Sequence, residues 1–243
     1  MYPWFVCVVG LCAASSAVAA DCVEPATLAR STVSITREFR EADATTKPDL
    51  IGIRGTGWFL SSRLIVTAAH VADAMQLTPG DWTDLQIRER DTLRSSPARV
   101  VKILGFQAEK LAVLELKTSF PGATALPVRA APLIPEERVT SLGYPGGRLR
   151  TAEGRFVQFG SDNQTAGAAL IEMSDGEDRL VLDHGSSGAP VVDCAGQVVG
   201  VVAKTFSQTI RFQSQVIRIS TPWQSPNVVA IPITEVRDFS WPE

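Results

Sequence analysis

Two residues of the chain have the types and settings that nucleophilic catalysis needs. Ser187 lies in the turn 185–190, which reads Gly-Ser-Ser-Gly-Ala-Pro and leads into an apolar strand. Such a turn can hold a serine at a tight bend while the flanking backbone N–H groups stay unpaired and can stabilise an oxyanion. A candidate base, His70, follows the apolar segment 64–69, whose last two residues are alanines that leave the imidazole sterically open. Neither segment is specific alone, and together they predict acyl-transfer chemistry.

The composition narrows the classes of protein that could use this chemistry. The 243 residues carry 23 Lys and Arg against 26 Asp and Glu, so no basic excess is present and a nucleic-acid partner is excluded. The 45% hydrophobic content is enough for a packed core and excludes a disordered chain. Only two histidines occur, so a histidine-rich metal site is excluded and we expect no metal and no cofactor. The second, His184, could touch a substrate, but a role in shaping its loop is favoured.

The rest of the chain reads as short strands with few helices. Runs of β-branched or alternating apolar residues between polar, Gly and Pro turns predict strands in two sets. These are 33–36, 57–60, 64–67, 84–88, 99–106 and 111–116, then 138–142, 154–159, 168–173, 189–193, 197–203, 215–219 and 228–231. Short helices are predicted at 70–75 and 233–239, with a Pro-rich linker at 119–135. About six strands in each half indicate an all-β protein of two paired barrels.

The first twenty residues are typical of a cleaved export signal. An uncharged apolar stretch runs from Trp4 to Ala14, and small residues follow up to Ala20. Its strongly apolar part is shorter than the ~20 residues needed to span a bilayer. We therefore expect residues 1–20 to be removed and the mature chain, without a membrane segment, to reside in the periplasm or outside the cell.

Removal of the signal leaves one pair of cysteines, Cys22 and Cys194. An even pair in an exported protein predicts a disulfide, which would join the N-terminus to the later half of the chain. Two free thiols are the alternative. Neither cysteine has metal-ligand spacing, so no catalytic role is predicted for either.

Several segments, taken in order, resemble the trypsin-like serine peptidases, and most closely their bacterial HtrA/Deg and glutamyl-endopeptidase branches. The segments are 55–59 (Gly-Thr-Gly-Trp-Phe), 64–71, 111–116, 139–147, 185–190, 196–201 and 230–232, and the match extends from residue 50 to residue 235. The resemblance implies the chymotrypsin-like fold, in which two six-stranded antiparallel β-barrels flank an active-site cleft. The barrels would be residues 21–127 and 128–243, together forming one peptidase domain.

The resemblance also implies an activity and its residues. The protein would be a serine endopeptidase acting on polypeptide substrates, with Ser187 as nucleophile and His70 as general base and acid. The backbone N–H groups of Gly185 and Ser187 would bind the oxyanion, and losing one such donor typically costs about 2.7–4 kcal/mol.

The same resemblance locates the primary substrate pocket. Val181 would lie at its base, and the strand Ala203, Lys204 and Thr205 would form its wall. An apolar base argues against a preference for Arg or Lys, because no carboxylate is there to pair with the cation. Lys204 could attract an acidic side chain or face solvent.

Activation and accessory parts are expected to follow the bacterial branches. The mature N-terminus lacks an Ile-Val start, and Ser186 replaces the acidic residue that would receive its amine, so no propeptide cleavage is expected. No sequence follows Glu243 that could form a PDZ domain, and none is expected. The insertion 204–227 could frame the cleft or serve as a contact surface. The oligomeric state is not predicted.

The pattern breaks at the third catalytic residue. The family has an aspartate directly before the Leu-Ala-Val-Leu strand, where this chain has Lys110. In a serine protease, replacing that carboxylate by an amide lowers kcat about 10⁴-fold, and a cation opposes the imidazolium further.

Three readings of this break stay open. Glu109 could reach His70 through an irregular turn, because neighbouring residues of an extended chain point to opposite faces. A carboxylate from Asp81, Asp84 or Asp91 could substitute, or a Ser-His dyad could act slowly. The protein could instead be a pseudoprotease that binds other molecules in its cleft. The intact His70 and Ser187 segments favour an active enzyme.

Overall fold

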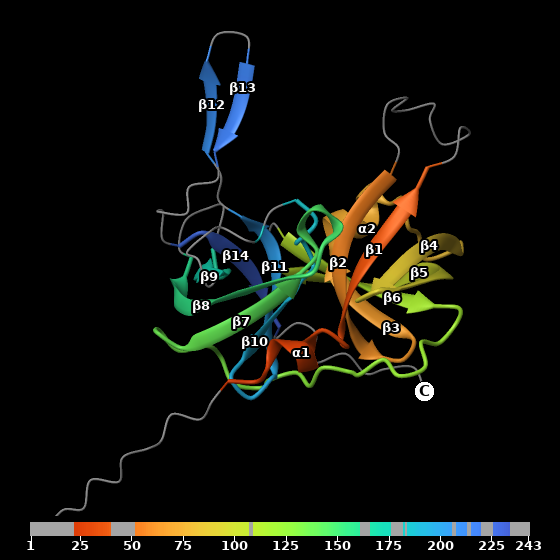
Figure 1. The fold of residues 1–243 in the computed structure, drawn as a ribbon, viewed down its shortest axis with the longest axis horizontal. Coiled ribbons are helices and arrows are strands. Elements are labelled where there is room, and N and C mark those ends of the chain that lie inside the picture. The colour runs from red at the N-terminus through yellow and green to blue at the C-terminus, as the bar shows by residue number, and fades with distance from the viewer. Residues whose placement is uncertain are drawn as a thin grey trace, which may run out of the picture.

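The computed structural model describes residues 22–39, 52–106, 109–160, 166–175, 182, 184–205, 208–212, 215–219 and 226–233. Its strands form two closed antiparallel barrels that lie side by side, with the first barrel on the right and the second on the left in Figure 1. The all-β, two-barrel prediction is therefore confirmed.

The first barrel contains six strands in the order β1-β2-β3-β6-β5-β4. Their bounds are β1 Thr32–Glu38, β2 Gly52–Ser61, β3 Leu64–Ala68, β4 Thr83–Glu89, β5 Thr92–Phe106 and β6 Glu109–Leu116. Short turns join β2 to β3 and β4 to β5, and Glu89 pairs with Thr92 at the second of these turns.

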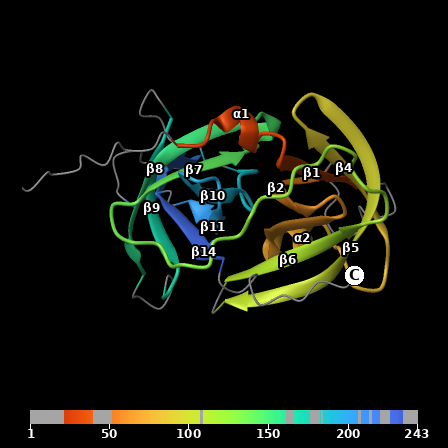
Figure 2. The same ribbon diagram turned by 90° about the horizontal axis from the view of Figure 1, so that it is seen from below.

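The second barrel also contains six strands, in the order β10-β11-β14-β9-β8-β7. Their bounds are β7 Arg138–Gly143, β8 Arg150–Phe159, β9 Ala169–Ser174, β10 Pro190–Asp193, β11 Val198–Thr205 and β14 Val228–Pro232. Figure 2 shows the two barrels side by side from below. The segment that connects them runs across the side that faces the viewer.

The structure differs from the predicted elements at a few places. The segment 215–219 is a strand, β13 Gln215–Ile219, but it pairs with β12 Gln208–Phe212 as a separate two-stranded sheet rather than joining the barrel. The predicted helix 70–75 is α2 Ala69–Ala74, and a helix α1 Pro25–Leu28 was not predicted. The predicted helix 233–239 lies outside the described residues except for Ile233.

Strand alternation divides β6 between two cores. Ala112 and Leu114 point into the first barrel, whereas Leu111 and Val113 belong to the apolar cluster shared by both barrels. Successive side chains of a strand point to opposite faces, so one strand can serve both cores. Glu109 and Lys110 at the start of β6 therefore point in these two opposite directions.

The N-terminal segment is attached to the second barrel. Cys22 and Cys194 form a disulfide, so the prediction of a bridge is confirmed over that of two free thiols. The Val23 N–H also donates to the Cys194 carbonyl at 3.0 Å. Across the described part of the chain, no helix has the length and apolar character to cross a membrane.

The predicted linker 119–135 has no helix or long strand and is fixed by an ion-pair network. Arg129 donates to Asp193 at 3.1 Å and forms an ion pair with Glu137. These carboxylates raise the pKa of the Arg129 guanidinium above its ordinary value, with the Glu137 hydrogen bond as the main cause. The network joins the linker to the end of β10.

Candidate active site

His70 is presented by the junction of β3 and α2. Its neighbours Ala69, Val71 and Ala72 are buried in the first barrel, while the imidazole is exposed at the surface of that turn. Partial desolvation lowers the pKa of His70 below 6.5, and the negative charges of Glu109 and Asp73 oppose that shift. A histidine kept neutral in this way is suited to accept a proton near neutral pH.

The serine loop lies against the end of the same strand. Gly188 has φ +90°, and a Cβ there would lie 2.1 Å from the Thr56 carbonyl oxygen, 2.2 Å from Thr67 Oγ1 and 3.0 Å from the Ala68 nitrogen. Only glycine allows this close approach, and a side chain would push the loop away. The structure therefore brings Ser187 to the β3 end that leads directly to His70.

The Ser187 hydroxyl points to the second barrel in this structure. It donates to the Ala203 carbonyl on β11 at 3.3 Å, which is long for a hydroxyl donor. Within the described residues, no hydrogen bond joins Ser187 to His70. A rotation of the Ser187 side chain is needed before the imidazole can accept its proton.

The two backbone donors predicted for the oxyanion site are held through the carbonyls of their own peptide groups. The His184 carbonyl accepts from the Gly146 N–H at 3.1 Å, and the Ser186 carbonyl accepts from the Ala189 N–H at 2.9 Å. In a trans peptide the N–H points opposite to the C=O, so these bonds fix the directions of the Gly185 and Ser187 N–H groups. Neither N–H has an acceptor among the residues the structure describes.

Thr56 anchors this loop from the first barrel, although no role was predicted for it from the sequence. Its N–H donates to the Ser187 carbonyl at 2.9 Å, and its hydroxyl donates to the Gly185 carbonyl at 2.6 Å. The same hydroxyl accepts from the Tyr144 N–H at 3.0 Å, and the Thr56 carbonyl accepts from the Thr67 hydroxyl at 2.7 Å. The one available signal was its place between Gly55 and Gly57, in a motif used only for family resemblance.

The start of β6 separates the two candidates for the third catalytic position. Lys110 is exposed, whereas Glu109 shares a face with Leu111 and is turned toward the second barrel. There its carboxylate forms an ion pair with Lys204 of β11 at 3.2 Å.

Glu109 acts on His70 through charge. It is the larger of the two charges that raise the His70 pKa, the other being Asp73. No hydrogen bond joins His70 to a carboxylate within the described part of the chain. The other proposed carboxylates, Asp81, Asp84 and Asp91, are exposed and are not among the charges that shift the His70 pKa.

The remaining predicted site residues lie around the loop or outside the described residues. Val181, the expected pocket base, is not described, nor is the side chain of Thr205. His184 is exposed beside the loop, and Ser186 is buried with no hydrogen-bond partner for its hydroxyl among the described residues. A buried hydroxyl at 186 cannot act as the nucleophile, which leaves Ser187 as the accessible serine of the turn.

The segments that carry His70 and Ser187 match one protein family. The family described as trypsin-like peptidase domain matches residues 55–201, which include His70, Glu109 and the serine loop. The chain belongs to the trypsin-like peptidases. This family assignment makes it a serine-type endopeptidase by class. Among curated protein sequences, no significant match was found.

Solved structures of serine proteases share its fold. The inactive form of the M. tuberculosis protease Rv3671c is 21% identical over 87% of this chain and 88% of its own, with a TM-score of 0.56. Deg5 is 19% identical over 86% of each chain, with a TM-score of 0.56. The serine endoprotease of Yersinia pestis is 17% identical over 86% of this chain and 61% of its own, with a TM-score of 0.56. At these identities the likeness shows the fold alone.

Proposed function

We propose that this trypsin-like peptidase hydrolyses polypeptides through an acyl-enzyme on Ser187, with His70 as base and acid. The observation that carries the proposal is the pair of fixed N–H groups at Gly185 and Ser187, which have no acceptor within the described residues and lie beside the Ser187 hydroxyl. Donors fixed before the reaction stabilise developing negative charge without having to reorganise, and this is usually the largest catalytic contribution.

The proposed reaction uses these groups in two steps. Ser187 Oγ attacks the scissile carbonyl while its proton passes to His70, and the carbonyl oxygen becomes an oxyanion held by Gly185 and Ser187 N–H. Collapse of this intermediate breaks the C–N bond, and His70 gives its proton to the leaving amine. Water then attacks the acyl-enzyme with His70 as base, and the proton returns to Ser187 as the acid product leaves.

Glu109 is proposed as the third member of the site, acting through its charge. The imidazolium that forms during each step is stabilised by a nearby anion, and Glu109 is the main anion acting on His70. Lys204 forms an ion pair with the Glu109 carboxylate at 3.2 Å and therefore competes with His70 for this negative charge. We therefore expect slower turnover than in a family member with an aspartate at position 110.

A fluorophosphonate probe tests the proposal directly, because it reacts with an activated serine without requiring a known substrate. The probe is expected to label the protein, and Ser187→Ala should remove the label. The neighbouring Ser186→Ala is the matched control and should keep it, because removing an unpaired buried hydroxyl is close to neutral for stability. Absence of labelling on folded wild-type protein would end the hydrolase proposal.

A second function is favoured by the charges at β6. Lys110 stands at the expected aspartate position, and Glu109 is engaged by Lys204. A cleft of this kind could bind a polypeptide without cleaving it, as a pseudoprotease. Peptide binding to wild-type protein with no labelling and no product by mass spectrometry would support this alternative.

The site of action is proposed to be the periplasm or the exterior of the cell. The apolar segment at the N-terminus and the Cys22–Cys194 disulfide support it, because disulfides persist in oxidising compartments. Fractionation of cells that express the full chain, with N-terminal sequencing of the mature protein, tests export and cleavage near Ala20. Full-length protein retained in the cytoplasm would contradict it.

A further inference from the structure

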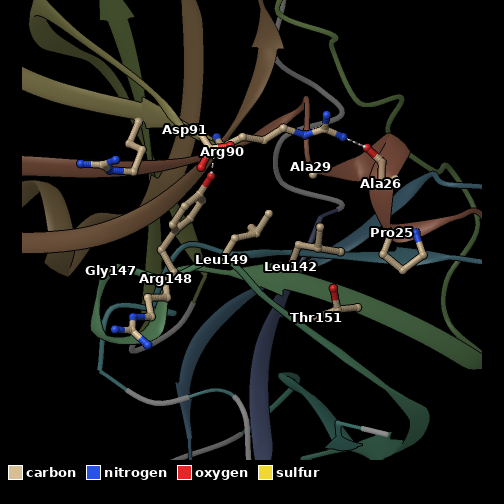
Figure 3. A pocket seen from close by; sticks show the side chains of 12 residues that line it. Pro25, Ala26, Ala29, Arg90, Asp91, Leu142, Gly147, Arg148, Leu149 and Thr151 are labelled. Atoms are coloured by element: carbon tan, nitrogen blue, oxygen red, sulfur yellow. Dashed lines mark hydrogen bonds between the residues drawn. The ribbon is translucent and has the colours of Figure 1, made fainter.

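A pocket that shares no residue with the catalytic proposal lies between the barrels, beside α1. Its volume is about 540 Å³, which falls in the range of ligand-binding sites. Three segments enclose it, namely α1 with its following turn, the tip of the β4–β5 hairpin, and the connection from β7 to β8. Figure 3 shows Arg90 extending from the hairpin to Ala26 of α1, with Leu142 and Leu149 below it.

The pocket is lined by more positive than negative charge. Arg88, Arg90 and Arg148 are among the lining residues, and Asp91 is the one acidic residue of the lining. None of the three arginines forms an ion pair with a described residue, although the Arg90 guanidinium donates to the Ala26 carbonyl. Glu89, beside Arg90 in the hairpin, does not line the pocket.

The other surface of the pocket is apolar. Pro25, Leu142 and Leu149 contribute hydrocarbon, and Tyr144 lines the pocket beside them. A small inorganic anion would contact the guanidinium groups but leave this apolar surface in water. A chain carrying both carboxylates and an apolar side chain satisfies both parts, because planar guanidinium groups bind carboxylates with paired hydrogen bonds.

We propose that this pocket binds an acidic polypeptide segment that contains an apolar residue, and that binding strengthens the oxyanion site. The first half of the proposal depends only on the pocket. The second half rests on the proposed peptidase function.

The connection between the two sites is the segment from Tyr144 to Leu149. One side of it lines the pocket, and the Tyr144 hydroxyl accepts from the Arg90 N–H at 3.0 Å. The other side holds the oxyanion loop, since the Tyr144 N–H donates to the Thr56 hydroxyl and the Gly146 N–H donates to the His184 carbonyl. A ligand that fixes this segment therefore fixes the peptide group that presents the Gly185 N–H.

Binding is tested on the Ser187→Ala protein, which cannot digest its ligand. The probe is a fluorescein-labelled octapeptide of alternating Glu and Leu, followed by fluorescence anisotropy. The expected result is saturable binding that weakens by at least about tenfold in the double variant Arg88→Glu/Arg148→Glu. Arg138→Glu is the control, because it reverses the charge of one exposed arginine outside the pocket and should not alter affinity.

Two outcomes would overturn the binding site. Unchanged affinity in the double variant, with an unchanged melting temperature, would place the peptide elsewhere, for example at Lys204 in the cleft. Equal binding of a Lys and Leu octapeptide would show that charge is not recognised. Inorganic phosphate that displaces the peptide at equal concentration would show an anion site without the apolar component and would also contradict the proposal.

The coupling is tested separately on wild-type protein by the rate of fluorophosphonate labelling. The acidic octapeptide is expected to raise that rate severalfold in wild-type protein and to leave it unchanged in Arg88→Glu/Arg148→Glu. Binding without acceleration would overturn the coupling while the site stands. Absence of any labelling would instead reject the peptidase function, and the binding measurement would still decide the pocket.

Discussion

The serine loop and the histidine helix come from different barrels and are held in different ways. Thr56 ties the loop to the first barrel with two donated hydrogen bonds, and the carbonyls of His184 and Ser186 are each fixed by a backbone N–H. The His70 imidazole has no hydrogen bond within the described residues, and it depends on the packing of α2 and on the charge of Glu109. The serine loop is thus positioned by backbone hydrogen bonds, whereas the protonation of His70 depends on nearby charge.

The two parts of the site should therefore differ in how well they tolerate substitutions. A backbone network tolerates few substitutions, because each lost bond leaves a buried group without a partner. An electrostatic contribution can be supplied from more than one position on β6, so a lysine at 110 does not by itself remove it. Substitutions in the serine loop are therefore expected to cost more than substitutions of the charges around His70.

Gly188→Ala should have the largest effect, because its Cβ would meet the backbone of β2 at 2.1 Å. We expect loss of fluorophosphonate labelling and a decrease of more than about 2 kcal/mol in the free energy of unfolding, measured by denaturant titration. Gly122→Ala is the control, since Gly122 has φ +87° but open space around it and should cost only about 1–2 kcal/mol. Equal costs for the two variants would contradict the close approach.

Thr56→Val should lower kcat about 10–100-fold, because the Gly185 carbonyl and the Tyr144 N–H each lose a buried partner worth about 1–3 kcal/mol. The KM should change less, since the lost contacts are on the loop and not on the substrate. Thr56→Ser retains the hydroxyl and should keep most of the activity. A Thr56→Ser variant as slow as Thr56→Val would indicate that packing, not hydrogen bonding, matters here.

Lys110→Asp should raise kcat at least about tenfold, because an aspartate there would replace a cation with the carboxylate that the catalytic histidine of the family requires. Steady-state hydrolysis of a casein-derived peptide measures it. Arg138→Asp makes the same charge change far from the site and should have no effect. A rate that stays the same in Lys110→Asp would mean that residue 110 does not face His70.

The smallest effects concern the pKa of His70, which NMR can follow because the chain has only two histidines. Glu109→Gln should lower the pKa of His70 further, and Lys204→Met should raise it by freeing the Glu109 carboxylate. His184→Gln assigns the signals. If neither variant moves the His70 titration, Glu109 has no role at this site.

The pH dependence of the wild-type protein follows from the same group. The pKa of His70 is lowered below 6.5, so the folded protein binds this proton less tightly than the unfolded chain. The contribution of His70 to stability is therefore lost as the pH falls below 6.5, and activity should persist to below that value because the base stays neutral. The acid limb of a kcat/KM profile measures this. An acid limb above pH 6.5 would contradict it.

The sequence was informative wherever local chemistry decides structure. Short alternating runs predicted most barrel strands, and the motifs around His70 and Ser187 placed both residues at element ends that meet. The strand 215–219 was predicted, but its pairing with β12 outside the barrel was not, because alternation cannot tell which sheet a strand joins. Thr56 and Tyr144 were missed as anchors, because their roles depend on hydrogen bonds between barrels that no local pattern encodes. The direction of the Glu109 side chain could not be predicted either, because it depends on how β6 pairs with β5.

The disulfide between Cys22 and Cys194 has a further consequence for the integrity of the chain. It closes a covalent ring with a sequence separation of 172 residues, and strands β1 to β10 all lie within it. One cut anywhere in that ring leaves the two fragments joined, so a protease that nicks its own loops would lose no part of itself. On gels such a molecule would run as an intact band until a reductant separates the pieces.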